Sequence, residues 1–123
     1  KEKREAEIYP FLQEAKTQYE IVLRKRKYYQ VYGMYGLVLF QMKDWDNAER
    51  NLREAVSKCD YKKFGNHCEP YWDELGDVLG EKGDIDGATE AYKQAIIGYK
   101  FNPGKITNIQ SKIKFLAIKK NTQ

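Results

Sequence analysis

Apolar and small residues recur at helical spacing over residues 72–95, in two runs that a short polar turn separates. The first run consists of Trp72, Leu75, Gly76 and Leu79. The second run consists of Ala88, Tyr92 and Ala95. Steps of three and four place each set on one face of a helix. The pattern therefore predicts two short helices joined by a tight turn at residues 82–84.

The same pattern occurs 40 residues earlier in the chain. The earlier positions are Tyr32, Gly36, Val38, Leu39, Asp44, Asp46, Ala48 and Ala55. Seven of these eight residues are identical to their counterparts 40 positions later, and the eighth pairs Tyr32 with Trp72. Valine, tyrosine and phenylalanine within residues 28–42 would otherwise favour a strand. The ungapped match instead predicts a second helical pair and an all-α fold.

The small residues in this pattern have a physical role. Gly36 and Gly76 would let the paired helix approach closely, with alanines doing the same from the other side. Asp44 and Asp84 precede the second helix of each pair, where a carboxylate can cap free N–H groups. Each unit is therefore predicted to be a close-packed helical hairpin.

These spacings resemble the tetratricopeptide repeat. Leu79 stands where that repeat usually has an aromatic residue, and the expected proline arrives late, as Pro103. A period of 40 exceeds the usual period of about 34, so we place the extra residues in 59–70. HEAT and armadillo helices also have longer periods, but the glycine and alanine positions favour the tetratricopeptide repeat.

The resemblance implies one solenoid-like domain over residues 1–123, with repeats at 29–62 and 69–102. Residues 10–26 resemble the second helix of an upstream repeat, so we expect a half-repeat helix that starts at Pro10. Residues 1–9 would be the frayed end of an earlier element.

A last helix is predicted over residues 105–118. Its apolar face consists of Ile106, Ile109, Ile113 and Leu116, with lysines on the remaining face. Such a helix would cap the open end of a repeat array. The alternatives are an interaction helix or a basic amphipathic membrane helix.

Composition narrows the function classes. The net charge of +4 on 123 residues is too small to indicate a nucleic-acid partner. The basic run at residues 24–27 belongs to no recognised nucleic-acid module. No apolar run approaches the roughly 18 residues that span a bilayer. The chain does not begin with Met, so we expect a fragment or a processed product.

No catalytic residue, cofactor site or metal site is predicted. The sequence has a single histidine, His67, and no phosphate-binding, dinucleotide-binding or nucleophile motif. Cys59, His67 and Cys68 lack a fourth zinc ligand. The two cysteines could form a disulfide, although two ordinary thiols are the favoured interpretation.

The resemblance implies that the first helix of each repeat lines a concave groove. In the second repeat the groove positions are Asp73, Glu74, Asp77 and Glu81. In the first repeat they are Gly33, Leu37 and Phe40, with Met34 and Gln41 alongside. The acidic stripe would suit a basic or amine-bearing segment, or it is simply a solvated helix face.

The family implies a non-catalytic scaffold that binds proteins or peptides. Carboxylates in the groove would repel acidic chaperone tails, so such tails are not expected as partners. The helix at residues 28–42 is apolar nearly all round. The N-terminal helix, a partner peptide or a second copy of the chain could pack on its apolar surface. The alternative function is therefore self-association, or a regulatory segment of a larger protein such as a transcription regulator.

Overall fold

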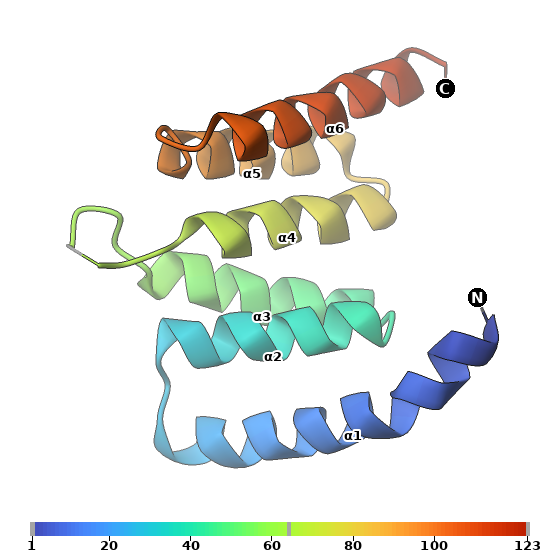
Figure 1. Ribbon diagram of the computed structural model, residues 1–123, viewed down its shortest axis with the longest axis vertical. Coiled ribbons are helices and arrows are strands. Elements are labelled where there is room, and N and C mark those ends of the chain that lie inside the picture. Colours follow the sequence, from blue (N-terminus) through green and yellow to red (C-terminus); the bar gives the residue numbers. More distant parts are fainter. Residues whose placement is uncertain (1, 64, 123) are drawn as a thin grey trace. The chain divides into compact units, whose positions relative to one another are not determined.

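The computed structural model describes residues 2–63 and 65–122, and every regular element within them is an α-helix. In chain order they are α1 (Glu2–Lys25), α2 (Tyr29–Gln41), α3 (Trp45–Lys58), α4 (Glu69–Glu81), α5 (Ile85–Gly98) and α6 (Pro103–Asn121) (Figure 1). The all-α prediction is confirmed. The contacts divide the chain into two compact units, one up to Lys58 and the other from Cys59 onward.

In the first unit α2 pairs with α3, and α1 packs along α2. Leu39, Ala48, Leu52 and Ala55 are fully buried and form the centre of this unit. A Cβ atom added to Gly36 would lie 2.7 Å from Cγ of Leu52. The glycine is therefore required for the close approach of α3, as its spacing predicted.

In the second unit α4 pairs with α5, and α6 packs on α5. Leu75, Val78, Ala88, Ala95 and Ile109 lose all or nearly all of their exposed surface. A Cβ atom on Gly76 would overlap the ring of Tyr92. The two units therefore use glycine at the same repeat position, against leucine in one and tyrosine in the other.

The turns inside the two hairpins also correspond. Asp84 accepts a hydrogen bond from the backbone N–H of Gly87 at 2.9 Å, and Asp44 accepts one from that of Asn47 at 3.4 Å. Both predicted caps are therefore present. Just before them, Lys43 and Gly83 adopt the left-handed conformation, with φ of 64° and 84°. Glycine is suited to that conformation, whereas lysine is strained in it.

The prediction that the first helix starts at Pro10 is wrong. α1 begins at Glu2 and continues through Pro10. The first turns of α1 leave the line of the rest of the helix (Figure 1). A proline inside a helix removes one backbone hydrogen bond and bends the helix, without always ending it.

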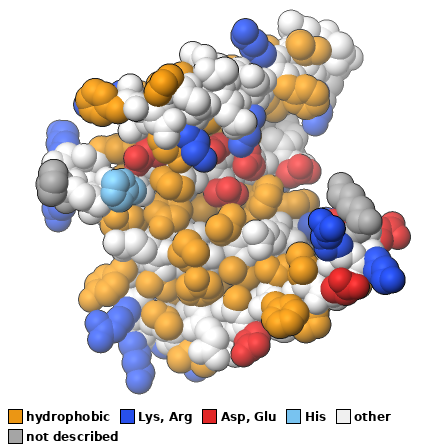
Figure 2. Space-filling model, in the orientation of Figure 1, with side chains coloured by type: hydrophobic (Ala, Val, Ile, Leu, Met, Phe, Trp, Pro, Cys, Tyr) orange, Lys and Arg blue, Asp and Glu red, His pale blue; other side chains and the backbone are white. Residues whose placement is uncertain are grey.

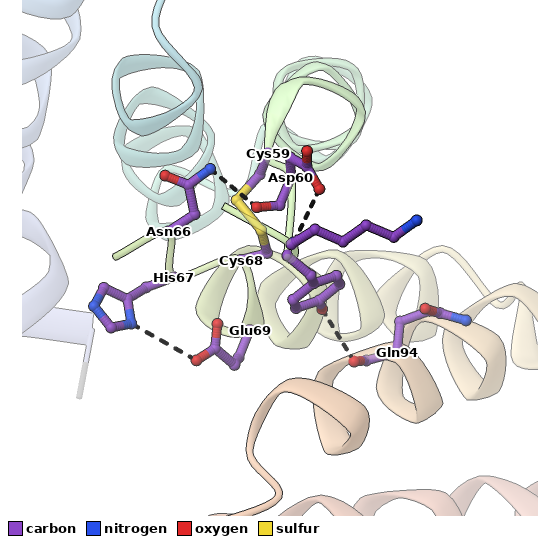
Figure 3. Close-up of a disulfide and its surroundings, with 9 residues drawn as sticks. Cys59, Asp60, Asn66, His67, Cys68, Glu69 and Gln94 are labelled. Atoms are coloured by element: carbon purple, nitrogen blue, oxygen red, sulfur yellow. Dashed lines mark hydrogen bonds and ion pairs between the residues drawn. A yellow bond between two sulfur atoms is a disulfide. The ribbon is translucent and has the colours of Figure 1, made fainter. Parts of the chain in front are cut away.

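The interpretation of Cys59 and Cys68 as ordinary thiols is also wrong, because the two form a disulfide (Figure 3). The disulfide closes the segment between α3 and α4, where the extra residues of the long period were expected. The Tyr61 hydroxyl donates to the carbonyl of Gln94 at 3.0 Å, which ties this segment to α5. Cys68 is fully buried, so the bridge is part of the packed interior.

The last helix is longer than the predicted 105–118. Asn102 accepts a hydrogen bond from the backbone N–H of Lys105 at 3.2 Å, and Pro103 occupies the first turn. Both features favour a helix start at this point. Among the described helices, none is long and apolar enough to cross a membrane.

Candidate binding faces of α2 and α4

The acidic stripe on α4 already holds a lysine from the same chain. The Lys112 ammonium lies 3.0 Å from Oδ1 of Asp73 and 3.0 Å from Oδ1 of Asp77. Lys112 was expected on the solvated side of the last helix, and that expectation is wrong. Two of the four acidic positions that the sequence predicted for a groove are therefore engaged by α6.

An aromatic residue completes the surroundings of this lysine. The Lys112 ammonium lies 5.5 Å from the centre of the Tyr92 ring, and the Tyr92 hydroxyl donates to Asp77. Burial would lower the pKa of Lys112, but the charges of Asp77 and Asp73 outweigh it and raise that pKa. The lysine thus stays charged among two carboxylates and a ring face.

Glu74 is the third carboxylate of this cluster. Burial, followed by the charges of Asp77 and Asp73, raises the pKa of Glu74 to about 7. Burial likewise raises the pKa of Asp73, although Lys112 opposes the change. With all three carboxylates ionised, one ammonium group does not neutralise the cluster.

Glu81, the last of the four acidic positions, is exposed at the C-terminal end of α4. Acidic side chains gather over α4, with lysines of α6 beside them (Figure 2). The stripe is therefore a real surface feature of the second unit, partly engaged by α6 and partly open.

The predicted residues on α2 differ in accessibility. Gly33 is buried and offers no side chain. Leu37 and Phe40 are half-buried, and the Phe40 ring lies 5.3 Å from that of Trp45. Met34 is 40% exposed. Leu37, Phe40 and Met34 therefore leave some apolar surface on α2, although α1 packs along this helix.

The family model of the tetratricopeptide repeat matches residues 29–57 and 69–96. These segments are two tandem tetratricopeptide repeats. The first consists of α2 and α3, and the second of α4 and α5. Tetratricopeptide repeats generally mediate protein–protein interaction, and the family is typically non-enzymatic. No curated protein matches the chain.

The tetratricopeptide pattern does not include Lys112, so this residue was not among the predicted site residues. Its position in the sequence nevertheless indicated an acidic partner. Lys112 lies three residues after Ile109 and four before Leu116, within the apolar face of α6 rather than opposite it. A lysine in the middle of an apolar stripe needs a buried acidic partner, and repeat 2 supplies two.

Proposed function

We propose that this chain is a non-catalytic scaffold that binds protein or peptide segments, with the first helix of each repeat as a binding face by itself. The observation that carries the proposal is that the carboxylates on α4 outnumber the one ammonium group, that of Lys112 on α6, which pairs with them. A surface that holds one lysine and stays negative can accept a second cation.

Lys112 supports the proposal of a basic partner, because it shows how this surface binds an ammonium group. Two carboxylates and one aromatic ring hold its ammonium group. The half-buried Leu37 and Phe40 on α2 give the first unit a separate face with apolar surface. We therefore expect lysine or arginine in the segment that binds α4, and large apolar side chains in the segment that binds α2.

The test uses labelled synthetic peptides in which lysine alternates with leucine, and matched peptides in which glutamate replaces lysine. Fluorescence anisotropy should show binding of the basic peptides alone. Charge reversal of Glu74 and Glu81 to lysine should weaken that binding at least about tenfold. These two residues are chosen because Asp73 and Asp77 also hold α6.

The matched control is Glu90→Lys, which reverses an exposed charge on α5. This variant should bind the basic peptides as the wild type does. Equal affinity of the Glu74/Glu81 variant and the wild type would refute the proposed surface. Circular dichroism at the same temperature checks that each variant is folded.

A second candidate is self-association, which the exposed apolar side chains of α1 favour. Phe11 is 72% exposed and Tyr9 is 51% exposed. Sedimentation velocity at several concentrations tests this candidate. Association that Phe11→Ser abolishes would support it, and a monomer at all concentrations would eliminate it.

A further inference from the structure

A polar hollow of about 440 Å³ lies in the first unit, and none of the predicted groove positions lines it. Its walls come from α1, α2 and the beginning of α3. The lining residues are Lys16, Glu20, Tyr35, Asp44, Asn47, Arg50 and Asn51. The volume falls in the range of about 300–1,000 Å³ that small-molecule sites occupy.

The two carboxylates of the hollow are already engaged. Glu20 accepts a hydrogen bond from the Tyr35 hydroxyl at 2.7 Å and pairs with Lys16 at 3.3 Å. Asp44 accepts from the side-chain amide of Asn47 at 2.8 Å, besides capping α3. Both carboxylates therefore have hydrogen-bond donors from the chain, and their two negative charges equal the two positive charges of Lys16 and Arg50.

Arg50 is the charged residue of the lining whose hydrogen-bond donors remain available. No described residue forms an ion pair or a hydrogen bond with its guanidinium group. That group carries five N–H donors in a planar fork. The amide nitrogens of Asn47 and Asn51 already donate within the chain, at 2.8 Å each, which leaves their amide oxygens as acceptors.

Repeat 2 shows that the fold does not require this polar lining. The counterparts 40 positions later of Tyr35, Asn47, Arg50 and Asn51 are Leu75, Gly87, Glu90 and Ala91. Leu75 and Ala91 are only 1% and 3% exposed. Repeat 2 thus has buried apolar residues at the positions of Tyr35 and Asn51. At the position of Arg50 it has an anion, Glu90.

We propose that this hollow binds a small carboxylate that also carries a hydroxyl or amino group, as hydroxy acids and amino acids do. The planar carboxylate matches the fork of Arg50, and the asparagine oxygens accept from the second group. Lys16 and Arg50 are balanced by Glu20 and Asp44, so the lining suits a singly charged group better than a phosphate dianion.

Titrations with L-malate, L-aspartate and inorganic phosphate at constant ionic strength test this site. Amide chemical shifts in NMR spectra report where each probe binds. Malate or aspartate should saturate and shift amides within residues 44–51, and phosphate should bind more weakly. Arg50→Glu, which installs the residue of repeat 2, should weaken carboxylate binding at least about tenfold.

Two further variants separate the site from general charge effects. Lys114→Glu makes the same charge change on an exposed position of α6 and should leave carboxylate affinity unchanged. Arg50→Lys keeps the charge but loses the planar fork, so it should recover only part of the affinity.

Three results would overturn the proposal. The first is that no probe saturates on the wild type. The second is that malate or aspartate binds Arg50→Glu as tightly as the wild type. The third is that phosphate binds more tightly than both carboxylates, which would indicate attraction by charge alone.

Discussion

The ammonium of Lys112 lies 3.0 Å from Oδ1 of Asp77, although 35 residues separate the two along the chain. This contact joins α6 to α4, whereas the main packing of α6 is on α5. It also offsets part of the negative charge on the helix that we propose as a binding face. Lys112 therefore serves both the stability of the second unit and the chemistry of its surface.

Replacement of Lys112 by Gln should lower the free energy of unfolding by about 1 kcal/mol, because the half-buried carboxylates lose their cation. Urea unfolding followed by circular dichroism measures the change. Lys114→Gln removes a charge from an exposed position on the same helix and should have a smaller effect. Equal losses in the two variants would contradict a specific role for Lys112.

Glu74 should make the stability of the protein depend on pH. The pKa of Glu74 is about 7 in the folded chain against an ordinary value of 4.5. The folded state therefore holds a proton that the unfolded state has lost, and its stability falls as the pH rises from 4.5 to 7. Glu74→Gln should stabilise the protein by about 1–2 kcal/mol at pH 8, and by much less at pH 4.5. Urea titrations at both values check this expectation, and a gain that is independent of pH would argue against it.

The left-handed turn residues provide a matched pair of substitutions. Lys43→Gly should stabilise the first hairpin by up to about 1 kcal/mol, since glycine adopts positive φ without strain. The loss of the 3.4 Å contact between Lys43 and Glu5 subtracts little, because that ion pair is exposed. Gly83→Ala should destabilise the second hairpin by about 1 kcal/mol. Thermal melts of both variants measure these opposite changes, and shifts of the same sign would contradict the turn assignment.

Gly36→Ala should destabilise the protein by about 1–3 kcal/mol, because its Cβ would lie too close to Cγ of Leu52. Leu52→Ala alone leaves a cavity and should also destabilise. The double variant should lose less than the sum of the two single losses, since the alanine methyl then has room. A double-mutant cycle of unfolding energies measures this coupling, and strict additivity would show that the two sites do not touch.

Much of the fold could be predicted because its determinants are local or repeated. The offset of 40 residues identified both hairpins, and the caps at Asp44 and Asp84 depend only on the following turn. The close approach at Gly36 and Gly76 followed from helical spacing. Each of these features is encoded within one helix or one helix pair.

The features that were missed depend on how distant segments face one another. The pairing of Lys112 with Asp73 requires the rotation of α6 about its axis, which is fixed by packing on α5. The polar hollow requires α1 and α3 to flank Tyr35. At Pro10 local rules allow both a helix start and a bend, and packing of α1 on α2 decides between them.

The disulfide between Cys59 and Cys68 has a consequence for where and how the chain can be made. Disulfides form and persist in oxidising surroundings and are rare in the reducing cytosol. A host that produces the chain in its cytosol should therefore yield molecules with the segment before α4 unlinked. Export to an oxidising compartment, or oxidative refolding, should give the disulfide-linked form. Mass spectrometry of the intact chain distinguishes the forms, because the linked form lacks two hydrogen atoms. Any binding measurement on this protein accordingly begins with a check of its oxidation state.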